Sequence, residues 1–248
     1  MKKSHLLTLV IFLCVVTRAQ NQTIDYSNFS QSAGIRVYAG YNTFDLSEAK
    51  DFLRKEIDYY NDLNIGVQEQ TMYPANSLFA FGAYYFPSRE LEINVNAEFT
   101  KTKGYSFYGD EFGELDITSE INFISVSLGI KKYFMDVVFI QPYVGLNFGL
   151  VNAKYELNEK VEFFQVAELN RDGSFEYSRL GYKAELNGGI SYNLSVMVID
   201  LEFGYRYSII PAPEREDIIA GQNYENPFEL NNSGFVFRLC FLTGIYWW

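Results

Sequence analysis

Histidine is almost absent from this 248-residue chain, and the single histidine, His5, lies close to the N-terminus. Histidine is the side chain that most often supplies a base near neutral pH and a ligand for zinc or copper. A Ser-Lys or carboxylate mechanism would not need it, but the sequence contains no Gly-x-Ser-x-Gly motif. We therefore predict no enzymatic activity, no cofactor and no catalytic or metal-binding residues.

Cysteine and long apolar runs are scarce as well. The two cysteines are Cys14 and Cys240, and no apolar run after Val16 approaches the length of a membrane helix, which is about 20 residues. If Cys14 is removed on export, Cys240 has no partner for an internal disulfide, and we expect it to be a small apolar filler. A membrane location would then require strands.

The N-terminus has the pattern of an export signal. Lys2 and Lys3 precede an apolar stretch from Leu6 to Val16, and Thr17-Arg18-Ala19 places small residues at the cleavage positions. We predict a signal peptide over 1–19, an N-terminal periplasmic segment over 20–32 and one barrel domain over 33–248. Removal of three basic residues and no acidic ones shifts the formal net charge from −11 to −14, which disfavours nucleic acid as a partner.

Strict alternation of apolar and polar residues is the main structural signal, and it is clearest at the C-terminus. From Phe235 to Trp248, one parity is apolar and the other carries Arg238, as in a strand between lipid and a polar lumen. Seven more strands are predicted at Ala33–Phe44, Asn76–Phe86, Leu91–Phe99, Ile124–Lys131, Ile140–Phe148, Tyr182–Ile190 and Ile199–Tyr207. The strand Asn76–Phe86 is apolar on both faces, so its orientation stays open.

The links between these eight strands alternate in length. Three are tight, at Pro87-Ser88-Arg89, Met135-Asp136-Val137 and Asn193-Leu194-Ser195, whereas the others are long, roughly 45–75, 104–116, 154–179 and 210–232. Outer-membrane barrels have short periplasmic turns and long external loops. Aromatic residues gather beside the short turns and predict an interfacial girdle: Tyr84, Tyr85, Phe86, Tyr133, Phe134, Tyr192, Tyr246, Trp247 and Trp248. The predicted fold is an all-β, eight-stranded antiparallel up-and-down transmembrane barrel.

With these features, the chain resembles the eight-stranded outer-membrane barrel family of the OmpA transmembrane domain and OmpX, in the version common among Bacteroidota. The resemblance covers Ala33 to Trp248 and rests on the export signal, Gln141-Pro142-Tyr143-Val144-Gly145, Phe203-Gly204-Tyr205-Arg206-Tyr207 and the aromatic C-terminus. It implies location in the outer membrane of a Gram-negative bacterium, among outer-membrane lipid and lipopolysaccharide. It also implies that the barrel assembly machinery reads Tyr246, Trp247 and Trp248. No peptidoglycan-binding domain is visible in the sequence.

If the polar parity points inward, charges of both signs meet inside one narrow barrel. Side chains fill the interior of an eight-stranded barrel, and buried charges must be paired. We therefore predict an ion-pair network that plugs the lumen, against the alternatives of a gated pathway or a paired-carboxylate centre. Its members are Arg36, Glu98, Lys183, Glu185, Glu202, Arg206 and Arg238, and the same parity carries Glu92, Lys131 and Asp200.

The external links contain one predicted helix and two acidic groups. Asp45-Leu46-Ser47-Glu48 resembles a capping box, and Leu46, Ala49, Leu53, Ile57 and Tyr60 follow at helical spacing to about Leu63. The helix would either bury this stripe on the barrel rim or act as a partner-docking or lid element. Acidic residues in the second link have oxygen ligands for calcium but no calcium-loop spacing, so a solvated tip is expected. The acids are Asp110, Glu111, Glu114 and Asp116, and in the third link Glu156, Glu159, Glu162, Glu168, Asp172 and Glu176.

Three functions compete on this basis. The first is a non-enzymatic outer-membrane barrel with a filled lumen, which acts in envelope structure or in contact with a surface or a protein partner through its external loops. The second is a narrow transporter of small or hydrophobic molecules, which would need a continuous lumen or a lateral opening. The third is a soluble, lipocalin-like ligand-binding barrel, in which the oily faces would point inward. Fold alone does not choose among them.

The C-terminal assembly signal makes a first prediction. Replacing Trp247 and Trp248 together by alanine should lower the amount of folded protein in the outer membrane, because the aromatic end of the last strand would no longer be read. Heat-modifiable gel migration of outer-membrane fractions measures this amount. Normal levels of the double variant would contradict the targeting role.

Overall fold

The structure, a computed structural model, describes residues 32–43, 46–62, 68–71, 73–88, 90–134, 140–164, 170–194, 197–211 and 230–246. The predicted signal peptide 1–19, Asp45 of the capping box, and Trp247 and Trp248 lie outside these ranges. The described elements are β1 (Ser32–Asn42), α2 (Ser47–Asp62), β2 (Gln68–Thr71), β3 (Asn76–Ser88), β4 (Leu91–Gly109), β5 (Gly113–Tyr133), β6 (Ile140–Phe163), β7 (Arg171–Leu194), β8 (Met197–Ile209) and β9 (Gly234–Tyr246).

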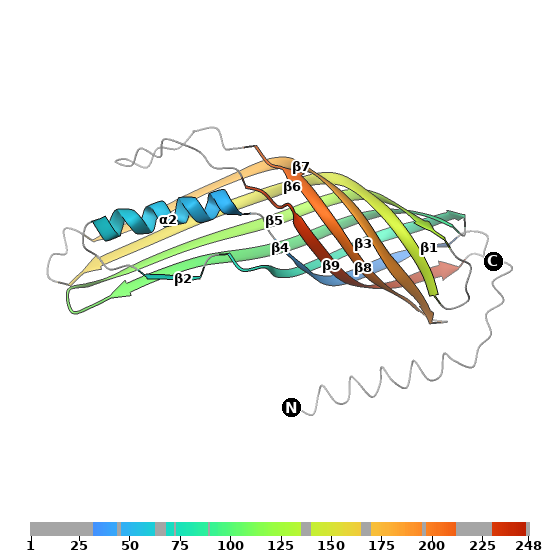
Figure 1. Ribbon diagram of the computed structural model, residues 1–248, viewed down its shortest axis with the longest axis horizontal. Coiled ribbons are helices and arrows are strands. Elements are labelled where there is room, and N and C mark those ends of the chain that lie inside the picture. Colours follow the sequence, from blue (N-terminus) through green and yellow to red (C-terminus); the bar gives the residue numbers. More distant parts are fainter. Residues whose placement is uncertain are drawn as a thin grey trace, which may run out of the picture.

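Eight of these strands close into an antiparallel ring, which confirms the predicted fold class (Figure 1). The order around the ring is β4-β3-β1-β9-β8-β7-β6-β5, and β5 pairs again with β4. β2 is an additional short strand that pairs only with β4. If the paired residues are followed from strand to strand around the ring, a path that starts at Leu91 of β4 comes back to β4 next to Thr100. The register is therefore displaced by about ten residues per circuit, and this displacement requires the strands to tilt relative to the barrel axis.

Between the short turns and the middle of the long strands, the outward face of the ring is apolar and the inward face is polar. On β8, Leu201 and Tyr205 point outward and are exposed, whereas Glu202 and Arg206 point inward and are buried. On β3, whose orientation the sequence left open, the odd-numbered Phe79 and Phe81 are exposed. An apolar belt therefore surrounds a polar interior, and the lipocalin-like arrangement with oily faces inward is excluded.

The prediction of long loops is wrong for two of the four links, because most of the residues in those two segments belong to strands. β4 and β5 continue well beyond the apolar belt and meet in the tight turn 110–112, where a loop 104–116 was expected. β6 and β7 likewise continue through most of 154–179. These four strands form a long sheet beyond the belt, with unbroken register between neighbours (Figure 1).

The reason for the wrong expectation is an exchange of the two faces, which is clearest along β5 and β6. On β5, the outward parity is apolar from Ile124 to Ile130 but polar at Glu114, Asp116 and Glu120. The inward parity changes in the opposite direction, from Ser125 and Lys131 to apolar residues. A strand that leaves lipid for water must present polar groups outward. Apolar and polar residues therefore still alternate beyond the belt, but the polar residues now face outward and the apolar residues face inward. The level of Ile124 thus marks the outer edge of the belt.

Helix α2 covers the inner face of this extended sheet (Figure 1), and the structure confirms the predicted helix. All five residues of its predicted apolar stripe are buried. They share a core with Tyr73, Ile210, Leu230 and inward residues of β5 and β6, and Phe52 contacts Tyr155 edge to face at 6.0 Å. The core consists of Leu46, Ala49, Leu53, Ile57, Tyr60, Tyr73, Leu115, Ile117, Ile121, Phe123, Val151, Ala153, Tyr155, Leu157, Val161, Ile210 and Leu230. In the part of the chain that the structure describes, no helix is long and apolar enough to cross a bilayer.

Helix α2 should be held mainly by this core. Leu53 is completely buried, so Leu53→Ala removes apolar contacts worth about 2–5 kcal/mol and should accelerate hydrogen exchange throughout α2. Exchange measured by mass spectrometry in detergent tests this, with the exposed Lys55→Ala on the same helix as the control. Equal exchange in both variants would mean that something other than the core holds the helix.

Candidate functional site: the charged lumen

The polar interior of the ring is the place where functional chemistry is concentrated. Ten charged side chains point into it, and each is at least nine-tenths buried. β1 contributes Arg36, β4 contributes Glu92 and Glu98, β5 contributes Lys131, β7 contributes Lys183 and Glu185, β8 contributes Asp200, Glu202 and Arg206, and β9 contributes Arg238. Strand alternation alone directs them inward, and ring closure then brings residues that are distant in sequence into contact.

Two arginines and two glutamates form the centre of the network. Arg206, which has no exposed surface, donates from Nη2 to Glu98 at 2.7 Å and to Glu185 at 3.0 Å, and its Nη1 forms an ion pair with Glu98 at 2.6 Å. Arg238 donates from Nη2 to Glu98 at 2.9 Å and to Glu185 at 2.7 Å. Both guanidinium groups therefore bind both carboxylates, which is the arrangement that offsets the cost of burying four charges.

A second group adjoins this centre through Glu202. Its carboxylate accepts from Arg238 Nη1 at 2.6 Å and pairs with Lys131 Nζ at 2.8 Å. Lys131 also lies 3.1 Å from Asp200, and the Tyr143 hydroxyl donates to Glu202 at 3.1 Å. Lys131 Nζ lies 4.2 Å from the centre of the Tyr143 ring, a cation–π contact.

Arg36 and Lys183 occupy the remaining positions. Arg36 pairs with Glu92, which also accepts from the Tyr133 hydroxyl at 2.8 Å and from Asn94 at 2.8 Å. Lys183 donates to the Ser125 hydroxyl at 2.6 Å, and its Nζ lies 3.8 Å from Glu98. All seven residues predicted for the network therefore lie together in the lumen. Glu92, Lys131 and Asp200, which have the same inward parity, lie with them.

Neutral polar residues complete the network, and none of them was among the residues predicted for it. Asn147 and Asn187 both donate to Glu185 at 3.3 Å, and Asn96 donates to Asn94 at 2.7 Å. The signal available in the sequence was the recurrence of asparagine and glycine at inward-facing positions of several strands. A side chain at Gly129 would collide with Asn147, and one at Gly145 with Asn187, so the glycines make room for the amide layer.

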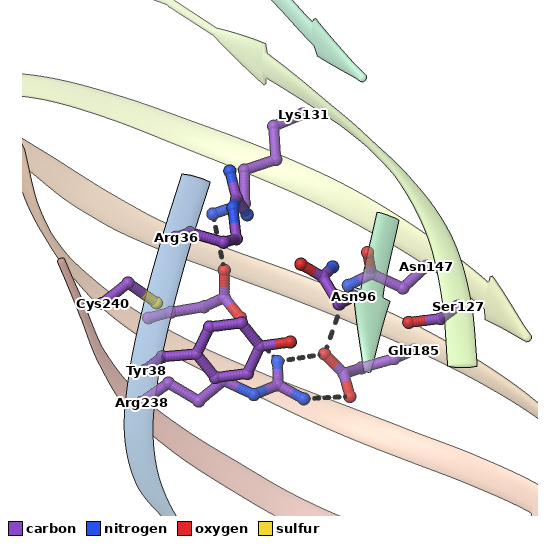
Figure 2. A pocket seen from close by; sticks show the side chains of 10 residues that line it. Arg36, Tyr38, Asn96, Ser127, Lys131, Asn147, Glu185, Arg238 and Cys240 are labelled. Carbon is purple, nitrogen blue, oxygen red and sulfur yellow. Dashed lines mark hydrogen bonds and ion pairs between the residues drawn. The ribbon is translucent and has the colours of Figure 1, made fainter. Parts of the chain in front are cut away.

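The network is balanced in charge and tightly filled. Its five carboxylates face five basic groups, so the formal charges of these ten residues cancel. Figure 2 shows Arg238 of β9 and Glu185 of β7, whose strands are separated by β8, meeting inside the barrel. The pocket between them has a volume of about 10 Å³, which is room for about one water molecule. Cys240, expected as a filler, is buried in its wall.

Aromatic side chains close the lumen at the short-turn end, which corrects part of the expected girdle. Tyr84 and Tyr133 point inward and are buried. The centre of the Phe86 ring lies 5.6 Å from that of Tyr84 and 5.6 Å from that of Tyr133, which in turn lies 5.2 Å from Tyr143. Because neighbours in a strand alternate, only some of the clustered aromatics can face lipid. The outward set is Tyr85, Phe134 and Tyr192.

The acidic groups of the external links lie apart from the lumen and serve several local contacts. Asp110 accepts from the turn amides of Phe112 and Gly113, and Glu159 is buried beside the Tyr60 hydroxyl at 3.4 Å. On the outer face, Lys154 pairs with Glu156 and Glu176, and Lys160 pairs with Glu162. Glu168 lies outside the described residues. Within the described ranges, no group of three or more aspartate, glutamate, histidine or cysteine side chains is arranged to hold a metal ion.

Comparison with known proteins finds similarity of fold only. The chain is similar to Neisserial surface protein A at 11% identity and a TM-score of 0.42, over 88% of this chain and 97% of that one. It is similar to the N-terminal β-barrel domain of OprF from Pseudomonas aeruginosa at 10% identity and a TM-score of 0.39, over 87% and 98%. It is similar to Ail, the attachment invasion locus protein of Yersinia pestis, at 16% identity and a TM-score of 0.35, over 87% of this chain and 96% of that one. No protein-family model and no curated protein matches the chain.

These neighbours are outer-membrane β-barrels, but at such low TM-scores the class of this chain is decided by its own features. A closed ring pairs the backbone groups of its strands, and its outer surface is an unbroken apolar belt above the short turns. Only such a ring or a helix can cross hydrocarbon with its backbone satisfied. The chain is therefore a transmembrane β-barrel of the outer-membrane type.

The network should contribute strongly to the stability of the barrel. Arg206→Ala would leave Glu98 and Glu185 with fewer partners in a buried site and should cost about 3–5 kcal/mol. Thermal unfolding in detergent, followed by the loss of the heat-modifiable form, measures the effect. Arg54→Ala is the control, because Arg54 is half exposed and 3.7 Å from Asp51, and exposed pairs contribute at most about 1 kcal/mol. An unchanged melting temperature for Arg206→Ala would show that the charges do not act as a network.

Proposed function

We propose that this chain is a non-enzymatic protein of the outer membrane of a Gram-negative bacterium, with a sealed lumen and a rigid external module. The barrel anchors the module, and the module makes contact with the surroundings of the cell. In this proposal the short-turn end faces the periplasm, and the sheet with α2 projects outward. The barrel assembly machinery would recognise the end of β9, beyond which Trp247 and Trp248 follow.

The observation that carries the proposal is that described side chains occupy the interior at three successive levels. The aromatic layer with Tyr84, Tyr133 and Tyr143 closes the short-turn end, and the ten-charge network fills the middle. Beyond the network, the apolar core beneath α2 occupies the space between the extended strands. A filled interior suits an anchor, whereas a conduit would need water or a solute path where these side chains lie.

The surface of the external module supports contact with a polar environment. Its outward residues on β5 to β7 are largely polar, and several charges are paired between strands, as Lys101 of β4 with Glu120 of β5 and Lys154 of β6 with Glu176 of β7. Lys101, Asn122 and Lys154 lie in one register row directly beyond the apolar belt, at the height where headgroups would begin. These residues would lie against lipopolysaccharide, and the parts farther out would be available to a protein partner.

The absence of histidine from the chain beyond His5 supports the non-enzymatic part of the proposal. The lumen does hold paired carboxylates and a Ser125–Lys183 contact at 2.6 Å, the groups that a histidine-free mechanism would use. Each carboxylate is engaged by basic groups, however, and the adjoining pocket holds about one water molecule. A substrate would have no room beside these groups.

Conductance in planar bilayers tests the sealed lumen against the transporter alternative. The wild-type protein should show no sustained openings, because the described interior is filled. Arg238→Ala combined with Glu185→Ala removes one charge of each sign and two long side chains, and should raise conductance. Lys101→Ala with Glu120→Ala, an ion pair on the outer face, is the matched control and should leave the bilayer as tight as the wild type. Steady conductance of the wild-type protein would favour the transporter.

A further inference from the structure

Two exposed phenylalanines lie side by side at the far end of the external module. Phe112 is in the turn between β4 and β5, and Phe164 follows the end of β6. The Phe164 amide donates to the Phe112 carbonyl at 3.0 Å, and the side chains are 55% and 61% exposed, for Phe112 and Phe164 respectively. From Ile124 at the edge of the apolar belt to Gly113, β5 continues for about 35 Å, so these rings lie far from the bilayer.

The turn that carries Phe112 is held in one conformation. Asp110 Oδ1 accepts from the Phe112 amide at 2.8 Å and from the Gly113 amide at 3.0 Å, and the Asp110 amide donates to the Gly113 carbonyl at 2.9 Å. The Tyr108 hydroxyl donates to the second oxygen of Asp110. This hydrogen bond from Tyr108, together with those from the two amides, lowers the pKa of Asp110. Phe112 is thus presented to solvent by a preorganised turn, which reduces the entropy lost on binding.

Acidic residues surround the two rings in an arrangement that folding does not favour. Glu114 on β5 lies directly opposite Glu162 on β6 in the register, and like charges in this position destabilise a sheet. Lys160 pairs with Glu162 and also attracts Glu114 and Asp172, so it is shared among three acids, and the exposed Glu111 adds another negative charge beside Phe112. Local arrangements that lower stability, with no compensating interaction in the fold, concentrate at functional sites.

We propose that this tip, defined as Glu111, Phe112, Glu114, Glu162 and Phe164, is a docking surface for a cationic polypeptide with apolar side chains. This inference rests on the proposed function, in which the module faces outward. Charge complementarity selects the partner: the phenylalanines would fill an apolar pocket and the carboxylates would meet basic groups around it. The same charges repel an anionic membrane, a polyanion and a second copy of the tip.

The test measures binding of a fluorescent peptide of alternating leucine and lysine to the full chain in nanodiscs of zwitterionic lipid, with empty nanodiscs as background. A leucine–glutamate peptide is the charge-reversed comparison. Phe112→Ser with Phe164→Ser, and separately Glu111→Gln with Glu114→Gln and Glu162→Gln, should each weaken binding by about tenfold or more. Asp51→Asn with Asp58→Asn and Asp62→Asn removes as much charge from the exposed face of α2, and should change binding by less than about twofold.

Several results would overturn the proposal. Equal losses in the tip-charge variant and the α2 control would mean that only net charge matters, and no binding by the wild-type protein would refute the surface itself. Phe112-dependent capture of anionic vesicles would assign the tip to a membrane, and Phe112-dependent dimers in light scattering would assign it to a second copy. Heat-modifiable migration and bilayer conductance of the same variants report on the barrel separately. A sealed, folded barrel without peptide binding would refute this inference and leave the proposed function standing.

Discussion

Pairing of β1 with β9 is the contact on which the remaining structure depends, because it closes the sheet into a ring. In hydrocarbon, an open sheet edge would leave backbone amides and carbonyls without partners, at a cost of several kcal/mol for each group. Closure removes both edges and creates an interior that is separated from lipid and lined by buried charged side chains. The charged and polar side chains inside must then find partners among themselves, and the charge-balanced network with its amide and tyrosine partners is the result.

The outer surface of the ring faces lipid over one part of its length and water over the rest, and the residue pattern of the strands changes at the boundary. Within the belt, apolar residues face lipid and polar residues face the lumen, whereas beyond Ile124 the outer face carries charges and the inner face of β5 and β6 is mainly apolar. One continuous set of strands therefore serves as a membrane anchor at one end and as half of a water-soluble core at the other. Helix α2 supplies the other half of that core, which explains why its stripe is apolar and its opposite face carries charges.

Much of the barrel was predictable from period-two alternation, because lipid imposes one solvent on every outward residue. The eight strands, the short turns and the inward parity of Arg206, Glu202 and Arg238 follow from that pattern. The extension of β4 to β7 was not predictable in the same way, because the alternation changes sign where the strands leave the bilayer and a window such as 104–116 then resembles a polar loop. Tyr84 and Tyr133 were misplaced in the girdle because clustering in sequence does not show which neighbour faces in.

The sequence by itself determined the class of each segment: strand parity, helix stripe, turn chemistry and the kinds of charge on the inward face. Only the tertiary structure decided which charges meet, because Glu98 reaches Arg206 and Arg238 through ring closure across a sequence separation that no local pattern encodes. It also decided that α2 lies on the extended sheet and that Phe112 and Phe164 share one tip. These contacts depend on the stagger of the strands, a property of the closed ring as a whole and of no single strand.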